Sequence, residues 1–217
     1  MKIVILGASG VCGRELVKQA LARGHEVTAA ARPTSGYQAP EGAALVRGSV
    51  FDGAFLEETF RGHDVVMSAL GLRLPGLSPF AKPEVPDLLS RASPIIVEAM
   101  RSAGVGRLIA ISAGGVGDSY AWMPAIFKAF IKTTALRKAY AELEVMERVL
   151  FASGLDVCCC RPTGLSDEPA TGEARVVTKV SGRAMIPRAD VAAWMLDAIE
   201  APTFAERCPV ITVTGGG

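Results

Sequence analysis

A short stretch close to the N-terminus, Ile3–Gly13, decides the fold; it reads IVILGASGVCG. Its apolar start predicts a buried strand, and the three spaced glycines predict a tight turn that leads into a helix. In such a unit the first glycine permits the turn, the second lets the backbone approach a pyrophosphate, and the third lets the helix pack closely on the strand. The N–H groups of the helix N-terminus favour an anion. The stretch therefore predicts a dinucleotide site formed by Gly7, Ser9, Gly10, Val11, Cys12 and Gly13.

The rest of the chain alternates short apolar runs with longer helical periods, which is typical of βαβ units. We predict one α/β domain over residues 1–217, a doubly wound parallel sheet with helices on both faces, whose strands are continuously apolar because both faces are covered. Residues from about 161 onward are expected to form a small cap on the substrate side. The predicted strands are Lys2–Leu6, Glu26–Ala31, Ala44–Val46, Asp64–Ala69, Arg107–Ser112, Leu155–Cys160 and Val210–Val213, and the predicted helices are Val11–Arg23, Ala54–Arg61, Asp87–Ala103, Ala135–Ala152 and Ala189–Glu200.

Composition excludes several classes of protein. The 217 residues are half apolar, and a net charge of +1 without a basic run argues against nucleic-acid binding. No apolar run reaches the length of a membrane span, and two histidines are too few for a three-histidine zinc site. We expect a cytoplasmic protein without a metal, a monomer or homodimer, that acts on a small molecule.

The histidines and cysteines have structural interpretations. His25 and His63 lie in near-identical junctions, RGHEV and RGHDV, where the glycine suits a left-handed helix C-cap. We therefore expect both histidines at the amino ends of strands, away from a ligand site. Cys158–Cys160 are adjacent on an apolar stretch, and the total of five cysteines is odd, so buried reduced thiols are expected instead of a disulfide framework.

The end of the second predicted strand selects between dinucleotides. An acidic residue there accepts from a ribose 2′-OH, whereas a basic residue accommodates a 2′-phosphate. Residues 29–35 read AAARPTS, which places Arg32 at this position, and we expect no acidic residue within its reach. The planar guanidinium suits phosphate, and the hydroxyls of Ser9 and Thr34 would add donors. NADP(H) is therefore preferred over NAD(H).

Two segments stand outside the βαβ rhythm, and both follow the carboxyl ends of predicted strands. They are Leu72–Val85, which is rich in proline, and Gly114–Thr134. Long loops at this edge of a sheet are more often functional than not. We expect a substrate pocket there, lined by Trp122, Met123, Phe127 and Leu74.

In this order the motifs resemble those of the atypical short-chain dehydrogenase/reductases, of the NmrA-like and biliverdin reductase B (flavin reductase) type, over nearly the whole chain. The landmarks after the glycine turn and Arg32 are Gly48–Asp52, Ala69–Gly71, Ile111–Ala113, Met146–Glu147, Ala152–Asp156, Arg161–Leu165, Pro169–Gly172 and Pro187–Ala192.

The resemblance implies a Rossmann core that binds NADP(H). It implies that the adenine lies near Ser49 and Val50, the dinucleotide along Leu70 and Gly71, and the nicotinamide near Ser112, Pro162 and Thr163. The chain departs from the family pattern at two places. Ser49 stands where an adenine-contacting acid is common, and Leu143 stands where the small-carbonyl and flavin reductases carry a histidine.

Hydride transfer also needs a proton donor, and none is obvious. The short-chain dehydrogenase pattern YxxxK becomes Tyr140 followed by Glu144, and a carboxylate there would raise the phenol pKa where a lysine lowers it. Lys132 and Lys138 are nearby, although lysines on amphipathic helices are usually solvated. Tyr140 and Ser112 are the candidate catalytic residues. Ser112 is the better candidate, either as the donor or as a small residue that lets the cofactor approach.

We expect an NADP(H)-dependent oxidoreductase that reduces a small hydrophobic flavin, quinone or carbonyl compound. Two alternatives remain open: an NADP(H)-binding sensor without turnover, which the lost lysine and histidine favour, and an epimerase or dehydratase, for which the chain is short.

Overall fold

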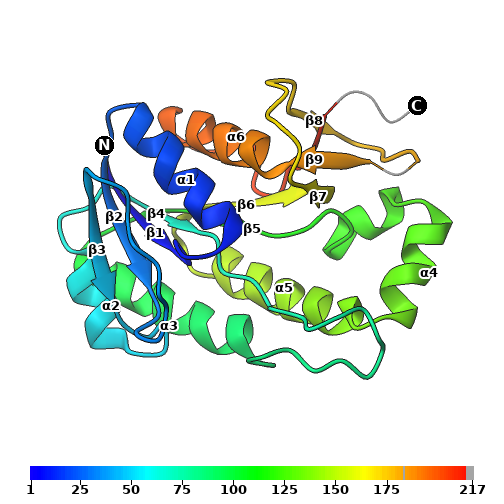
Figure 1. The fold of residues 1–217 in the computed structure, drawn as a ribbon, viewed down its shortest axis with the longest axis horizontal. Coiled ribbons are helices and arrows are strands. Elements are labelled where there is room, and N and C mark those ends of the chain that lie inside the picture. Colours follow the sequence, from blue (N-terminus) through cyan, green and yellow to red (C-terminus); the bar gives the residue numbers. More distant parts are fainter. Residues whose placement is uncertain (183, 214–217) are drawn as a thin grey trace.

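The computed structural model describes residues 1–182 and 184–213 and is built on one mostly parallel sheet (Figure 1). Its eight strands lie in the order β3-β2-β1-β4-β5-β6-β10-β8, and β8 runs antiparallel to β10. The order reverses where β1 pairs with both β2 and β4. In doubly wound sheets ligands generally bind at such a point, outside the strand carboxyl ends. The predicted fold class is confirmed. The strands are β1 (Lys2–Leu6), β2 (Glu26–Ala31), β3 (Ala43–Arg47), β4 (Val65–Ser68), β5 (Arg107–Ile111), β6 (Asp156–Pro162), β8 (Arg175–Val177) and β10 (Val210–Thr212), with β7 (Gly164–Ser166) and β9 (Met185–Pro187) as a separate pair.

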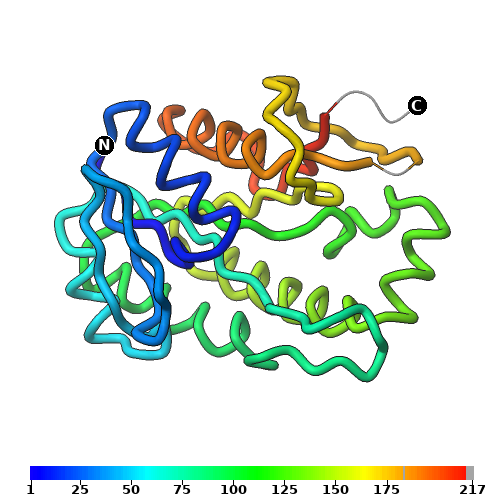
Figure 2. Tube along the Cα trace, viewed as in Figure 1, coloured from blue at the N-terminus to red at the C-terminus, as the bar shows by residue number. Residues whose placement is uncertain are grey.

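Helices cover both faces of the sheet. The first and last helices pack together on one face, and three others pack together on the opposite face, an arrangement that the chain trace in Figure 2 also shows. The helices are α1 (Val11–Ala22) and α6 (Arg188–Glu200) on the first face, α2 (Gly53–Phe60), α3 (Leu88–Ala103) and α5 (Leu136–Phe151) on the second, and η1 (Gly117–Trp122, a 3₁₀ helix) and α4 (Ala125–Thr133) between β5 and α5.

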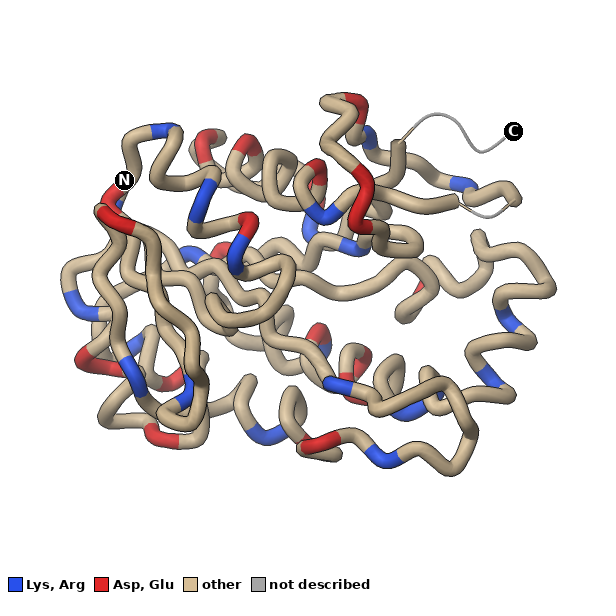
Figure 3. Tube along the Cα trace, viewed as in Figure 1, with Lys and Arg blue, Asp and Glu red and all other residues tan. Residues whose placement is uncertain are grey.

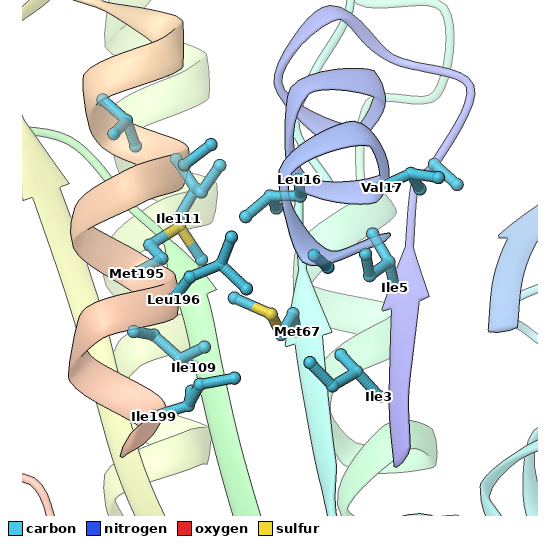
Figure 4. Packing of buried hydrophobic residues seen from close by; sticks show 14 of the residues in the cluster. Ile3, Ile5, Leu16, Val17, Met67, Ile109, Ile111, Met195, Leu196 and Ile199 are labelled. Atoms are coloured by element: carbon cyan, nitrogen blue, oxygen red, sulfur yellow. The ribbon is translucent and has the colours of Figure 1, made fainter. Parts of the chain in front are cut away.

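Each face of the sheet carries its own apolar core, and alternation along the strands supplies both. In β1, Ile3 and Ile5 belong to the core under α1 and α6, whereas Val4 and Leu6 belong to the core under α2, α3 and α5. Figure 4 shows Ile3 and Ile5 among the side chains of the first core. This double burial explains why the strand reads as a continuous apolar run.

The same alternation places the three adjacent cysteines of β6. Cys158 and Cys160 join the core under α1 and α6, and Cys159 joins the opposite one. Burial raises the pKa of Cys158 to about 12 and the pKa of its two neighbours as well, so these thiols stay neutral. The expectation of buried structural thiols is confirmed.

Two predicted loops have different outcomes. Leu72–Val85 contains no helix or strand, as expected. The second segment, Gly114–Thr134, is not a loop throughout, because it folds into η1 and α4. Apolar residues recur at helical spacing there, among them Phe127, Phe130 and Ile131. The segment was predicted as a loop because of the glycines and Trp122 that precede this period.

Part of the C-terminal region joins the main sheet. β10 pairs with β6, β8 pairs with β10, and β7 and β9 form the small second sheet. Sequence reasoning missed β7, β8 and β9, because strands of three residues are too short to show a period. That residues from about 161 onward cap a bound nicotinamide stays a prediction.

His25 and His63 lie at the junctions that were expected for them. Gly24 and Gly62 both have φ of +77°, the left-handed conformation that ends the preceding helix. His63 Nε2 lies 2.9 Å from Thr28 Oγ1 of β2. Both histidines therefore precede the strands they lead into, on the side away from the carboxyl ends.

Charged residues are spread along the chain. Figure 3 shows acidic and basic residues interspersed over the helices and loops. Among the described residues, no helix is long and apolar enough to cross a membrane, and no group of three or more His, Cys, Asp or Glu side chains is arranged to hold a metal ion.

The close packing of α1 on β1 gives a stability prediction. A methyl group on Gly13 would overlap the carbonyl oxygen of Gly7 and lie 2.8 Å from the Ala8 Cα. We expect Gly13→Ala to lower the free energy of unfolding by about 3 kcal/mol, because backbone atoms must move. Gly106→Ala is the matched control, since a methyl group there meets nothing within 4 Å. Urea denaturation measures both, and equal stabilities would contradict the packing argument.

Candidate functional site

The glycine turn is the candidate anion site, and it lies at the switch point of the sheet. Gly7 has φ of +74°, and the Gly10 N–H donates to the Gly7 carbonyl oxygen at 2.9 Å, which closes the turn. The N-terminus of α1 has no side-chain cap and no acidic residue in its first turn. Val11 is 59% exposed beside it. The amide N–H groups of this helix end thus point toward a region that suits a pyrophosphate.

A second helix begins close to this turn. Arg188, the first residue of α6, lies near Cys12 and forms an ion pair with Asp167 at 2.6 Å. Cys12 itself is half-buried, and burial raises its pKa despite this cation. Sequence reasoning missed Arg188, because nothing in the linear order indicates that α6 packs on α1.

Arg32 lies just beyond the end of β2, and its side chain is 52% exposed. The sequence suggested that no acid lies within its reach, and this was wrong: Glu84, from the loop after β4, forms an ion pair with Arg32 at 3.2 Å. The fold brings the two together because β2 and β4 both flank β1. A 2′-phosphate at Arg32 would have to share the guanidinium with the Glu84 carboxylate or displace that carboxylate.

Two further arginines surround the loop after Arg32. Arg47, at the end of β3, donates to the carbonyl oxygens of Ser35 and Tyr37 at 2.5 and 2.6 Å. Arg14, in α1, stacks over the Tyr37 ring and donates to the Ser9 carbonyl oxygen. These cations make the corner between the glycine turn and β2 electropositive. Sequence reasoning missed both, because their partners are distant along the chain.

The other residues expected at the cofactor follow the carboxyl ends of parallel strands. Ser49 and Val50 follow β3, and the Ser49 hydroxyl accepts from the Phe51 N–H at 3.2 Å. Leu70 and exposed Gly71 follow β4. Since these strands run parallel with β1, the structure brings the four residues to the same edge of the sheet as the glycine turn.

Pro162 and Thr163 occupy the end of β6. The Pro162 carbonyl oxygen accepts from the Gly114 N–H at 2.8 Å, which ties this strand end to the chain after β5. The Thr163 hydroxyl donates to the Thr212 hydroxyl at 2.9 Å. Both residues therefore lie at the strand edge expected for the nicotinamide, with their positions held by the neighbouring strands.

Ser112, directly after β5, belongs to a buried network of charges. Its hydroxyl donates to Glu147 Oε1 at 2.6 Å. Arg161 donates to the same carboxylate twice, from Nε at 2.9 Å and from Nη2 at 2.6 Å, and to Asp118 as well. The side chains of Arg161 and Glu147 are 3% and 5% exposed, so water does not solvate their charges. The carboxylate and the guanidinium stabilise each other's charge instead.

This network holds the end of β5 in place, and it also decides how the Ser112 hydroxyl points. Because the Ser112 hydroxyl donates its hydrogen bond to Glu147, its lone pairs are the part left to interact with a ligand. The hydrogen bond from Arg161 holds the pKa of Asp118 below its usual value. Arg161, a charged residue that directly follows the apolar Cys158–Cys160 within β6, was the available signal for this network, and sequence reasoning did not use it.

Tyr140 of α5 lies against the chain after β5. Its hydroxyl donates to the Gly114 carbonyl oxygen at 2.9 Å, and burial raises its pKa to about 12. The sequence correctly indicated a raised pKa but assigned it to Glu144. That carboxylate is instead 58% exposed and pairs with Arg148, one turn further along α5.

Leu143, at the position of the family histidine, is half-buried and packs against the core under α2, α3 and α5. Its neighbour Glu142 accepts from the backbone N–H groups of Leu89 and Ser90, both at 3.0 Å, and so caps the start of α3. This turn of α5 therefore serves helix packing.

The expected pocket residues come together only in part. Trp122 and Met123 line an open groove of about 500 Å³ between the end of η1 and the turn after β8. Phe127 packs beside them against the buried cluster of Met123, Val180 and Val210. Leu74 is not among the residues that line this groove.

A doubly wound sheet with a glycine turn and an uncapped helix N-terminus at its switch point defines a Rossmann-class nucleotide-binding protein. The NAD(P)H-binding family matches residues 7–202, and this chain belongs to that family. The expected resemblance is thereby confirmed.

Three similar proteins show how the family is represented. The uncharacterized protein YwnB of Bacillus subtilis (strain 168) is 27% identical over 224 residues, which cover 98% of this chain and 99% of YwnB. ChuY, an anaerobillin reductase from Escherichia coli O157:H7, has a TM-score of 0.80 at 24% identity, over 99% of this chain and 98% of its own. A wide-type short-chain dehydrogenase/reductase from Veillonella parvula DSM 2008, in complex with NADP, has a TM-score of 0.81 at 17% identity, over 99% and 95%. The two structures establish the shared fold.

The buried ion pair gives a second prediction. Arg161→Met leaves the Glu147 carboxylate buried without its cation, and we expect the free energy of unfolding to fall by about 3–5 kcal/mol. The double variant Arg161→Met with Glu147→Met removes both charges and should recover most of this loss. Chemical denaturation of the single and double variants tests the pair, and a double variant as unstable as the single one would argue against it.

Proposed function

We propose that the protein is an NADP(H)-dependent reductase that transfers a hydride to a small hydrophobic acceptor, such as a flavin, a quinone or a carbonyl compound. The observation that carries the proposal is the electropositive corner formed by the open glycine turn and Arg32. Family membership supports nucleotide binding, and the wide-type reductase of similar fold is in complex with NADP.

The preference for a 2′-phosphate rests on charge and geometry. Arg32 is exposed, and Arg14 and Arg47 stand near the same loop. Glu84 is the acid that comes near Arg32, and it approaches from a loop without helix or strand. A phosphate with two negative charges would compete for the guanidinium more strongly than a single carboxylate.

When bound, NADPH supplies the hydride, and the residues of this chain then orient the acceptor and hold or move the proton. Tyr140 keeps its proton at neutral pH, since its pKa is about 12, and its hydroxyl donates a hydrogen bond to the Gly114 carbonyl oxygen. Ser112 is our candidate for contact with the reacting end. To act as a donor its hydroxyl must turn away from Glu147, and otherwise it accepts a hydrogen bond while water supplies the proton.

An NADP(H)-binding sensor without turnover is the alternative from another class. The engaged hydroxyls of Ser112 and Tyr140 favour it, because neither is free to donate. Epimerase or dehydratase chemistry is the further alternative. We also propose a cytoplasmic monomer or homodimer, and the net charge of +1 argues against a nucleic-acid partner.

Hydride transfer is the direct test of the reductase proposal. Purified protein is mixed with NADPH and a panel of flavins, quinones and aldehydes, and the loss of NADPH absorbance is followed. We expect oxidation with at least one hydrophobic acceptor. Binding of NADPH without oxidation across the panel, together with similar affinities for NADPH and NADP⁺, would instead support the sensor.

Cofactor preference is tested at Arg32. We expect Arg32→Glu to weaken NADPH binding by roughly 10-fold to 100-fold, the range of a charge-assisted hydrogen bond, and to change NADH binding little. Glu84→Gln is the matched control, because it removes the competing carboxylate and should strengthen NADPH binding about twofold to threefold. Titration calorimetry measures both. Equal losses of NADPH and NADH affinity in Arg32→Glu would contradict the 2′-phosphate assignment.

A further inference from the structure

The open groove beside the strand edge has two walls from distant parts of the chain. One wall is Ala121–Pro124, at the end of η1, and the other is the turn Thr178–Gly182 after β8. The Val180 N–H donates to the Trp122 carbonyl oxygen at 3.2 Å, which joins the walls. At about 500 Å³ the groove has the size of a small-molecule site.

The inner end of the groove adjoins the residues placed at the nicotinamide. Met123, 5% exposed, lies between the two regions, because a methyl group built on Gly114 would come within 3.6 Å of its Cε. Gly114 in turn donates to Pro162 and accepts from Tyr140. A molecule that fills the groove would therefore face the carboxyl ends of β5 and β6 across the side chain of Met123.

The lining is apolar at its base and cationic at its edge. Trp122, Met123, Pro124 and Val180 supply apolar surface, Thr178 and Ser181 supply hydroxyls, and none of the described residues that line the groove is acidic.

Lys179 is the cation of the lining; it is exposed and forms no ion pair with the described residues. A second cation, Lys128, lies at the rim, where its Nζ donates to the Ala121 carbonyl oxygen at 3.1 Å. Asp118, on the same short helix as Ala121, shares Arg161 with Glu147, so these three side chains together carry one negative charge against the two lysines. The charge at this edge is therefore positive.

We propose that this groove is the outer half of the acceptor site, and that it selects a mostly apolar, aromatic acceptor carrying a carboxylate or sulfonate that pairs with Lys179. The proposal rests on the reductase function proposed above and adds the substrate class. A lysine that has no ion-pair partner among the described residues and lies beside apolar surface complements an amphiphilic anion, whereas a neutral acceptor would leave the cation unused.

Probe binding tests the groove without turnover. The anionic dye anilinonaphthalenesulfonate and its neutral analogue phenylnaphthylamine are titrated into the full chain, with fluorescence as the readout. We expect Lys179→Met to weaken the anionic dye about tenfold and the neutral dye less than twofold, and Lys179→Arg to restore the anionic dye. Lys18→Met, which removes an exposed lysine of α1, is the matched control and should change neither. An unchanged affinity of the anionic dye in Lys179→Met would overturn the proposal.

Turnover separates this proposal from the reductase function. With NADPH, the kcat/KM for naphthoquinonesulfonate should fall about tenfold in Lys179→Met, while that for naphthoquinone stays within twofold of the wild-type value. If both acceptors are reduced and both respond equally to the variant, the anion selectivity is wrong and the reductase stands. If neither acceptor is reduced while the dye still depends on Lys179, the reductase proposal fails for these quinones and the groove remains an anion-binding site.

Discussion

The contact on which the rest of the structure depends is the approach of α1 to the end of β1. Gly13 presents no side chain where a Cβ would overlap the Gly7 carbonyl oxygen, so the helix can start directly over the strand end. This contact aims the uncapped N-terminus of α1 at the switch point of the sheet. It also sets the position of α1 over the core, against which α6 then packs. A single steric constraint thus determines both the anion site and the arrangement of one helical layer.

A buried ion pair organises the opposite end of the site. Glu147 and Arg161 connect α5 to β6, and through Ser112 and Asp118 they also hold the end of β5 and the start of η1. Charges with exposures of 3% and 5% are stable there because each compensates the other's lost hydration. The same network accepts the hydrogen bond of the Ser112 hydroxyl. The contacts that hold the end of β5 in place therefore also keep this hydroxyl from donating to a substrate.

The sequence allowed the fold and the cofactor region to be predicted to different extents. Continuous apolar strands and the glycine spacing are local signals, and they were sufficient for the sheet, the turn and the place of Arg32. The helix α4 was missed because glycines before it suggested a loop, and the three-residue strands were missed because they show no period. Glu84 was missed for another reason: its contact with Arg32 joins residues on different loops.

Residues close together in the chain determined which elements form and where the candidate anion site lies, because strand burial, turn geometry and helix dipoles act over a few residues. Only the tertiary structure decided which charges meet. It pairs Arg161 with Glu147 and Glu84 with Arg32. It also brings Trp122 and Lys179 together as residues of the two walls of the groove. Electrostatic and packing energies depend on distance in space and on burial, and the linear order of residues specifies neither.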